Sequence, residues 1–178
     1  IGFWLLLWPG LWGLFLSGNM DISYFTIVVL GSFLTRSVGC AINDMIDIQY
    51  DKKVDRTKNR PLANGDLTFK EALIFTIILA AACLYLLSLT NIQTICLVLF
   101  VAVPMIVIYP LMKRFIAIPQ LFLGATFGLS LPISYSMAEG YVSLEIIFLY
   151  LGCIFWILAY DSYYALCDIE DDKKININ

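Results

Sequence analysis

The sequence contains no histidine, and this absence excludes several classes of enzyme. Without histidine a chain cannot build the Ser/His or Cys/His pairs of nucleophilic hydrolases, or the histidine-ligated sites of zinc hydrolases. The five cysteines form no CxxC pair and lie in or beside apolar runs, so we interpret them as small buried apolar side chains. Any side-chain chemistry must therefore depend on carboxylates.

Charge is also scarce. Only 14% of the 178 residues are charged while 61% are hydrophobic, whereas soluble domains contain roughly 25% charged residues. This composition excludes a water-soluble globular domain. The formal net charge of −3 gives no general basic surface, so we expect no nucleic acid among the partners.

Long apolar runs dominate the sequence instead. A helix that crosses a bilayer needs about 20 apolar residues, and six runs approach or exceed this length. The runs show no sustained period-two alternation, which argues against strands. The sequence therefore predicts an all-α, polytopic transmembrane helix bundle with six spans, at residues 1–18, 22–46, 69–90, 92–112, 115–138 and 142–167.

Basic residues alternate between the loops. The first, third and fifth connections contain no Lys or Arg, whereas the second, the fourth and the C-terminal tail contain ten of the eleven basic residues. The positive-inside rule places such basic loops on the cytoplasmic side. We expect that side to carry Lys52, Lys53, Arg56, Lys58, Arg60, Lys70, Lys113, Arg114, Lys173 and Lys174.

A first acidic cluster follows the second apolar run, within NDMIDIQYD at residues 43–51. At 100° per residue, Asn43, Asp47 and Asp51 fall within about 80° of one another on a helix. Arg36 lies on the same stripe, two turns earlier. One helix face thus presents an amide and two carboxylates, with a guanidinium deeper in the membrane.

A second acidic cluster ends the sixth run. Asp161, Asp168 and Asp172 fall within about 40° of one another on a helix. The loop assignment places both clusters on the cytoplasmic side, where they can face each other. Facing carboxylates repel unless a cation compensates, and Mg²⁺ prefers carboxylate oxygens while keeping sites for phosphate. The two clusters therefore indicate Mg²⁺ that bridges a diphosphate.

Basic residues lie beside these clusters, and two interpretations of them remain open. Arg56 follows the first cluster, and Lys113 with Arg114 occupies the intervening basic loop. Such groups hold a diphosphate and stabilise it as it leaves. The alternative is that they only determine the topology.

These motifs resemble those of the UbiA family of membrane prenyltransferases. Residues 43–51 match the family's NDxxDxxxD motif, and DIEDD at 168–172 matches its second motif, DxxxD. The segments LLLWPGLWGLFLSG, YPLMKRF at 109–115 and YDSYYALCDIEDDKK look most like 4-hydroxybenzoate polyprenyltransferases of ubiquinone biosynthesis.

The resemblance implies a nine-helix fold, of which this chain covers about the first six helices, as part of a single transmembrane prenyltransferase domain at residues 1–178 of a longer protein. It implies an enzyme of the bacterial or mitochondrial inner membrane, with its active site on the cytoplasmic or matrix side. The substrates would be polyprenyl diphosphate and 4-hydroxybenzoate, within membrane lipid. The metal ligands would be Asn43, Asp47, Asp51, Asp168 and Asp172, with Lys113 and Arg114 on the diphosphate.

The roles of two ionisable residues within spans rest on their chemistry. Arg36 would pair with the carboxylate of the aromatic acid, and Asp161 would orient the phenol or accept a proton.

Two other functions remain open: a UbiA-type enzyme for another acceptor, such as haem, a naphthoate or a chlorophyll precursor, and a divalent-cation transporter. A GxxxG pattern at Gly124 and Gly128 indicates only close helix packing.

Overall fold

The computed structural model describes residues 2–19, 21–55, 57–112 and 118–174, with the side chains of 110–112 and 164–174 left undescribed. Within these ranges every regular element is a helix. The elements are α1 (Gly2–Leu16), α2 (Ile22–Asp51), α3 (Pro61–Asn64), α4 (Phe69–Ser88), α5 (Ile92–Leu97), the π-helix η1 (Val98–Ala102), α6 (Val103–Met112), α7 (Pro119–Gly128), α8 (Ser130–Glu139) and α9 (Leu144–Lys174).

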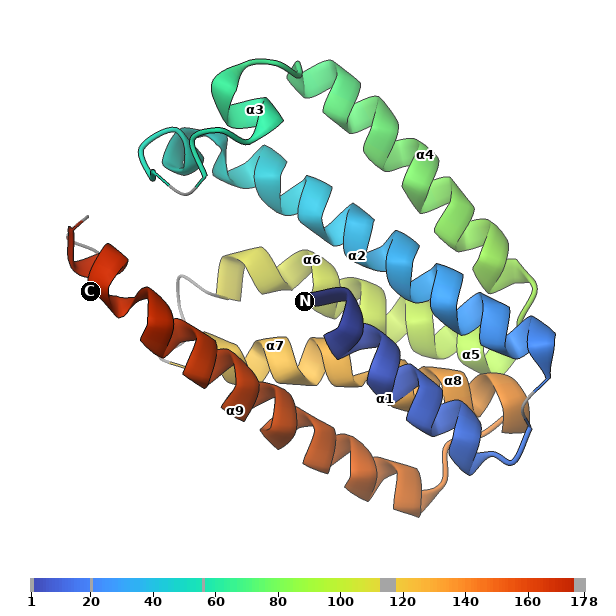
Figure 1. The fold of residues 1–178 in the computed structure, drawn as a ribbon. Helices are drawn as coiled ribbons and strands as arrows, with labels where there is room; N and C mark the ends of the chain where they lie inside the picture. Colours follow the sequence, from blue (N-terminus) through green and yellow to red (C-terminus); the bar gives the residue numbers. More distant parts are fainter. Residues whose placement is uncertain (1, 20, 56, 113–117, 175–178) are drawn as a thin grey trace.

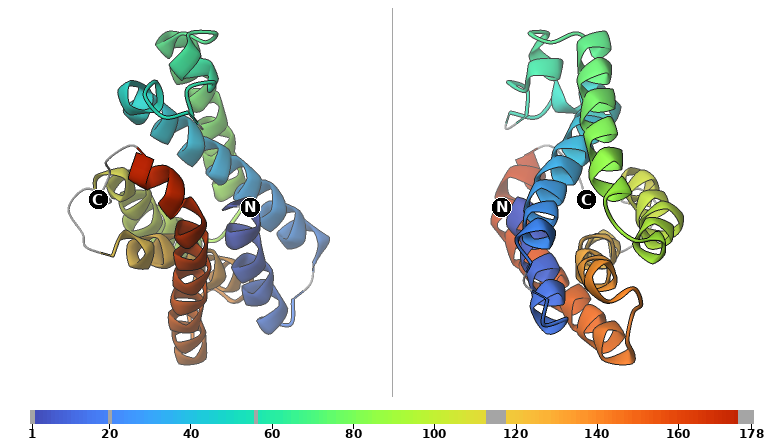
Figure 2. Two further views of the ribbon diagram at one scale, coloured as in Figure 1. Left: turned by 60° about the vertical axis from the view of Figure 1, so that its left-hand side comes forward. Right: turned by 90° about the vertical axis from the view of Figure 1, so that its right-hand side faces the viewer.

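The helices form an elongated bundle, in which α2 pairs with α4 and α7 pairs with α9 (Figure 1; Figure 2). Five helical segments are long and apolar enough to cross a membrane, namely Ile22–Asp51, Phe69–Ser88, Ile92–Tyr109, Pro119–Glu139 and Leu144–Tyr163. The first expected span corresponds to α1, whose 15 residues fall short of the usual crossing length. The prediction of a polytopic helix bundle is confirmed.

The surface of the bundle is apolar, as a bilayer requires. Large side chains such as Phe100 and Phe15 are 76% and 70% exposed. In water such a surface would drive aggregation, whereas lipid solvates it. The chain is an integral membrane protein. The interpretation of the cysteines as buried is correct for Cys153 and wrong for Cys40 and Cys96, which are exposed. Cys83 is half-buried, and the side chain of Cys167 lies outside the described residues.

Two of the expected spans are interrupted within their length. The span that starts at Ile92 passes from α5 through η1 into α6, so that one turn has the wider π geometry. The span that starts at Pro119 changes from α7 to α8 at Leu129. Hydrophobicity alone does not predict either change, because the apolar sequence continues through both.

The two helices that carry the acidic motifs extend beyond their apolar runs. The second run ends at residue 46 but α2 continues to Asp51, and the sixth ends at residue 167 but α9 continues to Lys174. Neither extension contains a Pro or Gly that would end a helix. The acidic motifs therefore lie on helices, as the spacing argument requires.

The GxxxG pattern lies where α7 meets α9. A Cβ added to Gly124 would lie 2.7 Å from the carbonyl oxygen of Ile154, and one added to Gly128 would lie 3.1 Å from the ring of Tyr150. The Tyr150 hydroxyl also donates a hydrogen bond of 2.8 Å to the carbonyl oxygen of Ala125. The expected close packing is confirmed, because only glycine allows the two backbones to approach this far.

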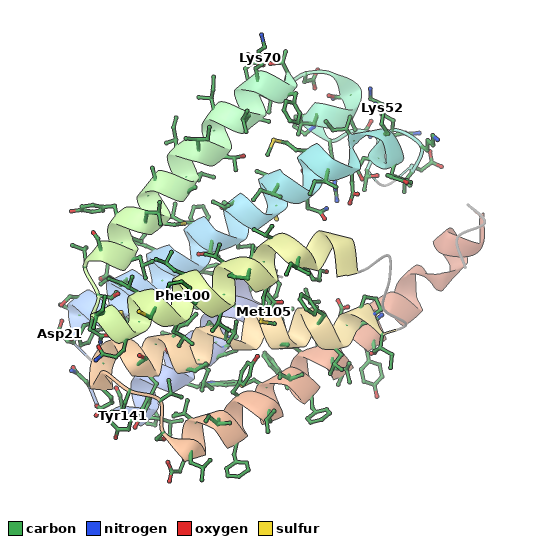
Figure 3. All side chains as sticks on the ribbon, turned by 180° about the vertical axis from the view of Figure 1, so that it is seen from behind. Asp21, Lys52, Lys70, Phe100, Met105 and Tyr141 are labelled. Carbon is green, nitrogen blue, oxygen red and sulfur yellow. The ribbon has the colours of Figure 1, made fainter. Side chains whose placement is uncertain are left out.

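The loop residues labelled in Figure 3 lie at two ends of the bundle, as the charge pattern predicts for them. Figure 3 shows Lys52 and Lys70 toward one end, with Asp21 and Tyr141 at the other. The C-terminal end of α9 lies toward the same end of the bundle as the C-terminal end of α2 (Figure 1; Figure 3). The helix ends that carry the two acidic motifs therefore lie at one end of the bundle, which we call the basic end.

Candidate active site at the basic end of the bundle

The acidic stripe of α2 consists of Asn43, Asp47 and Asp51. It begins within the membrane span and ends at the last residue of the helix. Asp47 and Asp51 are each 8% exposed, although both carry a carboxylate. Asn43 lies one turn before Asp47 and lines a cavity. Buried carboxylates in a membrane protein require compensation by a cation or by hydrogen-bond donors. This stripe is therefore the strongest functional candidate among the described residues.

The described part of the loop that follows α2, residues 52–55 and 57–60, folds back against the end of the helix. The hydroxyl of Thr57 donates a hydrogen bond of 3.1 Å to the carbonyl oxygen of Asp51. Backbone hydrogen bonds from Lys58 to Val54 (2.8 Å) and from Arg60 to Thr57 (2.9 Å) tighten the turn. The loop thus places Arg60 above the acidic stripe, just before Pro61 begins α3.

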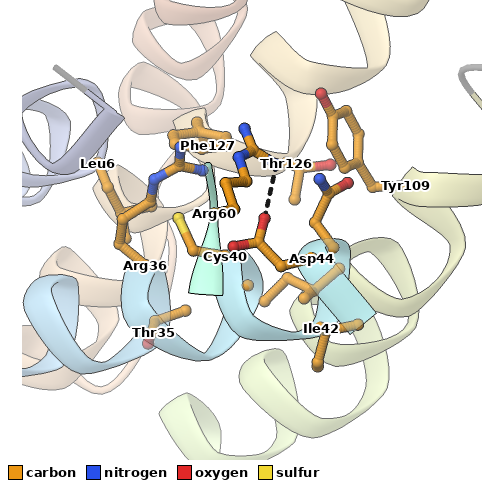
Figure 4. Close-up of a pocket in the computed structure, with 13 residues that line it drawn as sticks. Leu6, Thr35, Arg36, Cys40, Ile42, Asp44, Arg60, Tyr109, Thr126 and Phe127 are labelled. Atoms are coloured by element: carbon orange, nitrogen blue, oxygen red, sulfur yellow. Dashed lines mark hydrogen bonds and ion pairs between the residues drawn. The ribbon is translucent and has the colours of Figure 1, made fainter. Parts of the chain in front are cut away.

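The guanidinium of Arg60 bridges two carboxylates of α2. Its Nη1 atom donates to Oδ1 of Asp44 at 2.7 Å and to Oδ2 of Asp51 at 3.0 Å. Figure 4 shows the bond to Asp44. Hydrogen bonds between charged groups are stronger than those between neutral groups, so this bridge offsets much of the negative charge of Asp44 and Asp51.

Asp44 is the site residue that the sequence reasoning missed. It is seven residues before Asp51, and on a helix this spacing places the two side chains within about 20° of each other. Asp44 is also the second letter of the NDxxDxxxD motif. Both signals are present in the sequence, although a stripe defined by Asn43, Asp47 and Asp51 does not include Asp44.

A cavity of about 220 Å³ lies beside the stripe, where α2 faces α1, α6 and α7 (Figure 4). The guanidinium carbon of Arg36 lies 5.5 Å from the centre of the Phe127 ring, within cation–π distance. The cavity combines apolar walls with a few polar groups, as small-molecule sites do. Its polar lining comes from Thr35, Arg36, Asn43, Asp44, Arg60, Tyr109 and Thr126.

A second cavity, of about 380 Å³, lies where α2 faces α1, α3 and α4. Its lining is mostly apolar and includes Phe33 and Phe75. Three residues of α2, one turn apart from each other, line both cavities: Arg36, Cys40 and Asp44.

The remaining site predictions differ in how far the structure describes them. Asp161 is half-buried in α9 and is not part of the lining of either cavity. Arg56, Lys113 and Arg114 lie outside the described residues. The backbone of Asp168 and Asp172 belongs to α9, but their side chains are not described. The roles assigned to all six residues stay predictions.

The donors on α2 have the chemistry that Mg²⁺ prefers. Asp44, Asp47 and Asp51 supply carboxylate oxygens and Asn43 supplies an amide oxygen, all from one face of one helix. Among the described side chains, no three acidic or sulfur ligands are grouped closely enough to hold a metal ion by themselves. The set on α2 therefore fits one side of a metal site, and a second element must supply the other side.

Comparison with known proteins places these features in a family. Residues 6–178 match the UbiA prenyltransferase family. The chain is 43% identical to 4-hydroxybenzoate octaprenyltransferase from Polynucleobacter asymbioticus, over 99% of this chain and 62% of that protein. It is 44% identical to the protein of the same name from Dechloromonas aromatica, over 99% of this chain and 60% of that protein. The chain thus spans about three fifths of the length of these curated relatives.

Solved structures share the fold. A UbiA homologue from Aeropyrum pernix superposes with a TM-score of 0.78 at 24% identity, covering 96% of this chain and 65% of that one. A UbiA homologue from Archaeoglobus fulgidus bound to GPP and Mg²⁺ superposes with a TM-score of 0.70 at 21% identity, covering 98% of this chain and 66% of that one. With the family match, the acidic motifs and the shared fold in agreement, this chain belongs to the UbiA prenyltransferase family.

Proposed function

We propose that the whole protein transfers a polyprenyl chain from polyprenyl diphosphate to the ring of an aromatic acceptor, 4-hydroxybenzoate, in ubiquinone biosynthesis. One observation carries the proposal: the guanidinium of Arg60 bridges the buried carboxylate of Asp51 and the partly buried carboxylate of Asp44, at the edge of a cavity with apolar walls. The names of the similar proteins support the choice of acceptor.

In this proposal Mg²⁺ is held by Asn43, Asp47 and Asp51 from α2 and by Asp168 and Asp172 from α9. The ion supplies charge neutralisation to a departing diphosphate. The solved homologue bound to GPP and Mg²⁺ supports this choice of metal and of substrate class. The helical backbone that carries both motifs ends toward one end of the bundle, which supports a shared site.

The basic residues complete the diphosphate site. Arg60 lies above the stripe, and Arg56, Lys113 and Arg114 are proposed to join it on the diphosphate oxygens. Preorganised positive groups stabilise the charge that develops on a leaving group and so lower the barrier. The allylic carbon–oxygen bond then breaks with its electron pair on the diphosphate.

The acceptor is proposed to occupy the cavity of about 220 Å³ beside Arg36. The Arg36 guanidinium binds the carboxylate of 4-hydroxybenzoate and so orients the ring. A ring carbon ortho to the phenol forms the new bond to the allylic carbon. The ring then loses its proton, which restores the aromatic system. Asp161 does not line the cavity but interacts electrostatically with Tyr109, which does, and its carboxylate is proposed to accept this proton once the acceptor is bound.

The charge of the loops indicates which side of the membrane the site faces. We infer that the basic end faces the cytoplasm or the mitochondrial matrix, in a bacterial or mitochondrial inner membrane, because Lys52 and Lys70 both lie toward that end. The prenyl chain then stays in contact with membrane lipid while the diphosphate reaches the polar end.

Transfer of a labelled prenyl chain tests the proposal. The full-length protein in liposomes, given labelled polyprenyl diphosphate, 4-hydroxybenzoate and Mg²⁺, is expected to form a prenylated acid that neither substrate yields alone. Competition by a naphthoate or a haem precursor tests the other acceptors. Flux of divalent ions without product would instead favour a transporter, an alternative that membership in a prenyltransferase family disfavours.

A further inference from the structure

The bridge made by Arg60 concentrates two interactions on one nitrogen atom. Nη1 contacts Asp44 at 2.7 Å and Asp51 at 3.0 Å, and these residues are two helical turns apart. Asp51 is the more enclosed partner, since its side chain is 12% exposed while those of Asp44 and Arg60 are 31% and 37% exposed. The guanidinium thus neutralises the acidic stripe from the water-facing side.

A divalent cation on the acidic stripe would bind to the same carboxylate groups that this guanidinium contacts. Mg²⁺ binds carboxylate oxygens at about 2.0–2.1 Å, and two cations beside one carboxylate repel each other strongly where the surroundings are apolar. Asp51 is also one of the residues assigned to the metal. A metal on Asp51 is therefore expected to weaken the bridge, and the bridge is expected to weaken binding of the metal.

We propose that Arg60 is a positioning residue that competes with the divalent cation. In the free protein it holds Asp44 and Asp51 together; when the cation binds, it leaves Asp51 and becomes available to the diphosphate. This inference rests on the proposed function, because that function supplies the cation and the diphosphate. The inference adds that Arg60 and the divalent cation replace each other at the carboxylates of the acidic stripe.

The loop permits this exchange without rearranging its backbone. Hydrogen bonds to the backbone of Asp51, Val54 and Thr57 fix the turn, and Pro61 fixes the start of α3. Only the long side chain of Arg60 needs to change rotamer, and this occurs rapidly for partly exposed side chains. The end of α2 therefore stays in place while its cationic partner changes.

Binding of Mn²⁺ in the absence of diphosphate tests the competition. Mn²⁺ accepts the same oxygen ligands, and its unbound fraction is measured by electron paramagnetic resonance. We expect full-length Arg60→Gln to bind Mn²⁺ about five- to tenfold more tightly than the wild-type protein, within the range of coupling usually found between two ligands. The Arg60→Lys protein is expected to lie between the two.

Lys58→Gln is the matched control. It removes the same charge from the same loop, but Lys58 pairs with Asp55, whose side chain is 97% exposed. Exposed pairs contribute little, so its Mn²⁺ affinity is expected to change by less than about twofold. Similar tightening in Lys58→Gln and Arg60→Gln would overturn the proposal, because net charge alone would then explain the effect.

Binding of inorganic pyrophosphate with Mn²⁺ present gives the second readout. We expect Arg60→Gln to bind pyrophosphate about tenfold more weakly, opposite in direction to its effect on Mn²⁺ alone. A merely structural role would weaken both, and that result would overturn the inference. If the wild-type protein bound no Mn²⁺, the proposed function would fail as well; if it bound Mn²⁺ and formed product while Arg60→Gln showed no tightening, only this inference would fail.

Discussion

Arg36 of α2 and Phe127 of α7 contact each other in the lining of the smaller cavity, with the guanidinium carbon 5.5 Å from the centre of the ring. The ring offers its negative face to the cation, which favours one orientation of the guanidinium. Arg36 also lines the cavity in which the acceptor is proposed to bind. The contact also connects the motif-bearing helix to the helix that packs on α9.

Substitution of Arg36 is expected to weaken use of the acceptor. Loss of a charged hydrogen bond to a carboxylate costs about 1.5–3 kcal/mol, so Arg36→Gln is expected to lower kcat/KM for 4-hydroxybenzoate by about 10- to 100-fold. Steady-state kinetics at saturating prenyl diphosphate measure this. Phe127→Leu keeps the charge and is expected to have a smaller effect; an equal loss in both variants would contradict the role given to the guanidinium.

Removal of one carboxylate from each motif is expected to stop turnover. Asp47 is 8% exposed on the acidic stripe, and Asp47→Ala removes a proposed metal ligand while leaving the apolar residues of the spans in place. We expect Asp47→Ala and Asp168→Ala each to lose at least about 10²-fold in kcat while they remain folded in the membrane. The control is Asp66→Asn, an exposed carboxylate after α3; wild-type turnover in both motif variants would remove the two-motif mechanism.

Removal of divalent cations by a chelator is expected to stop prenyl transfer without unfolding the protein. Because packed apolar side chains such as Leu123, Phe127 and Ile157 hold the helices together, EDTA is expected to abolish prenyl transfer and to leave the helical circular dichroism signal unchanged. Addition of Mg²⁺ is expected to restore product formation. Transfer that continues in excess EDTA would exclude a divalent cation from the reaction.

Gly124 provides a test of the packing between α7 and α9. A Cβ at this position would lie 2.7 Å from the carbonyl oxygen of Ile154, so Gly124→Ala forces a shift of the helix backbone and is expected to destabilise the protein by about 1–3 kcal/mol. Thermal unfolding in detergent measures the change. Gly152→Ala is the control on α9, because a Cβ there meets nothing within 4 Å; equal destabilisation by both substitutions would contradict the packing argument.

Much of the fold was predictable because lipid imposes simple rules on a sequence. Run lengths located the spans, and the placement of Lys52 and Lys70 against Asp21 follows from the charge of the loops. The true ends of α2 and α9 were not predictable from hydropathy, because these helices continue where the apolar sequence stops. The π turn at Val98–Ala102 has no simple signature in composition.

The site was predictable in part. Helical periodicity placed Asn43, Asp47 and Asp51 on one face, and the family motif identified the chemistry. The contact between Arg60 and Asp44 was not predictable, because it spans 16 residues and depends on how the intervening loop turns. Such a contact is determined by tertiary structure and not by any periodic pattern.

Because Arg36, Cys40 and Asp44 line both cavities, a single column of side chains on α2 forms the partition between two chambers. A bulky substitution at any of these three positions would narrow both chambers together. Substitutions on the outer walls, at Thr126 on one side and Phe75 on the other, are therefore the ones that can assign a ligand to one chamber.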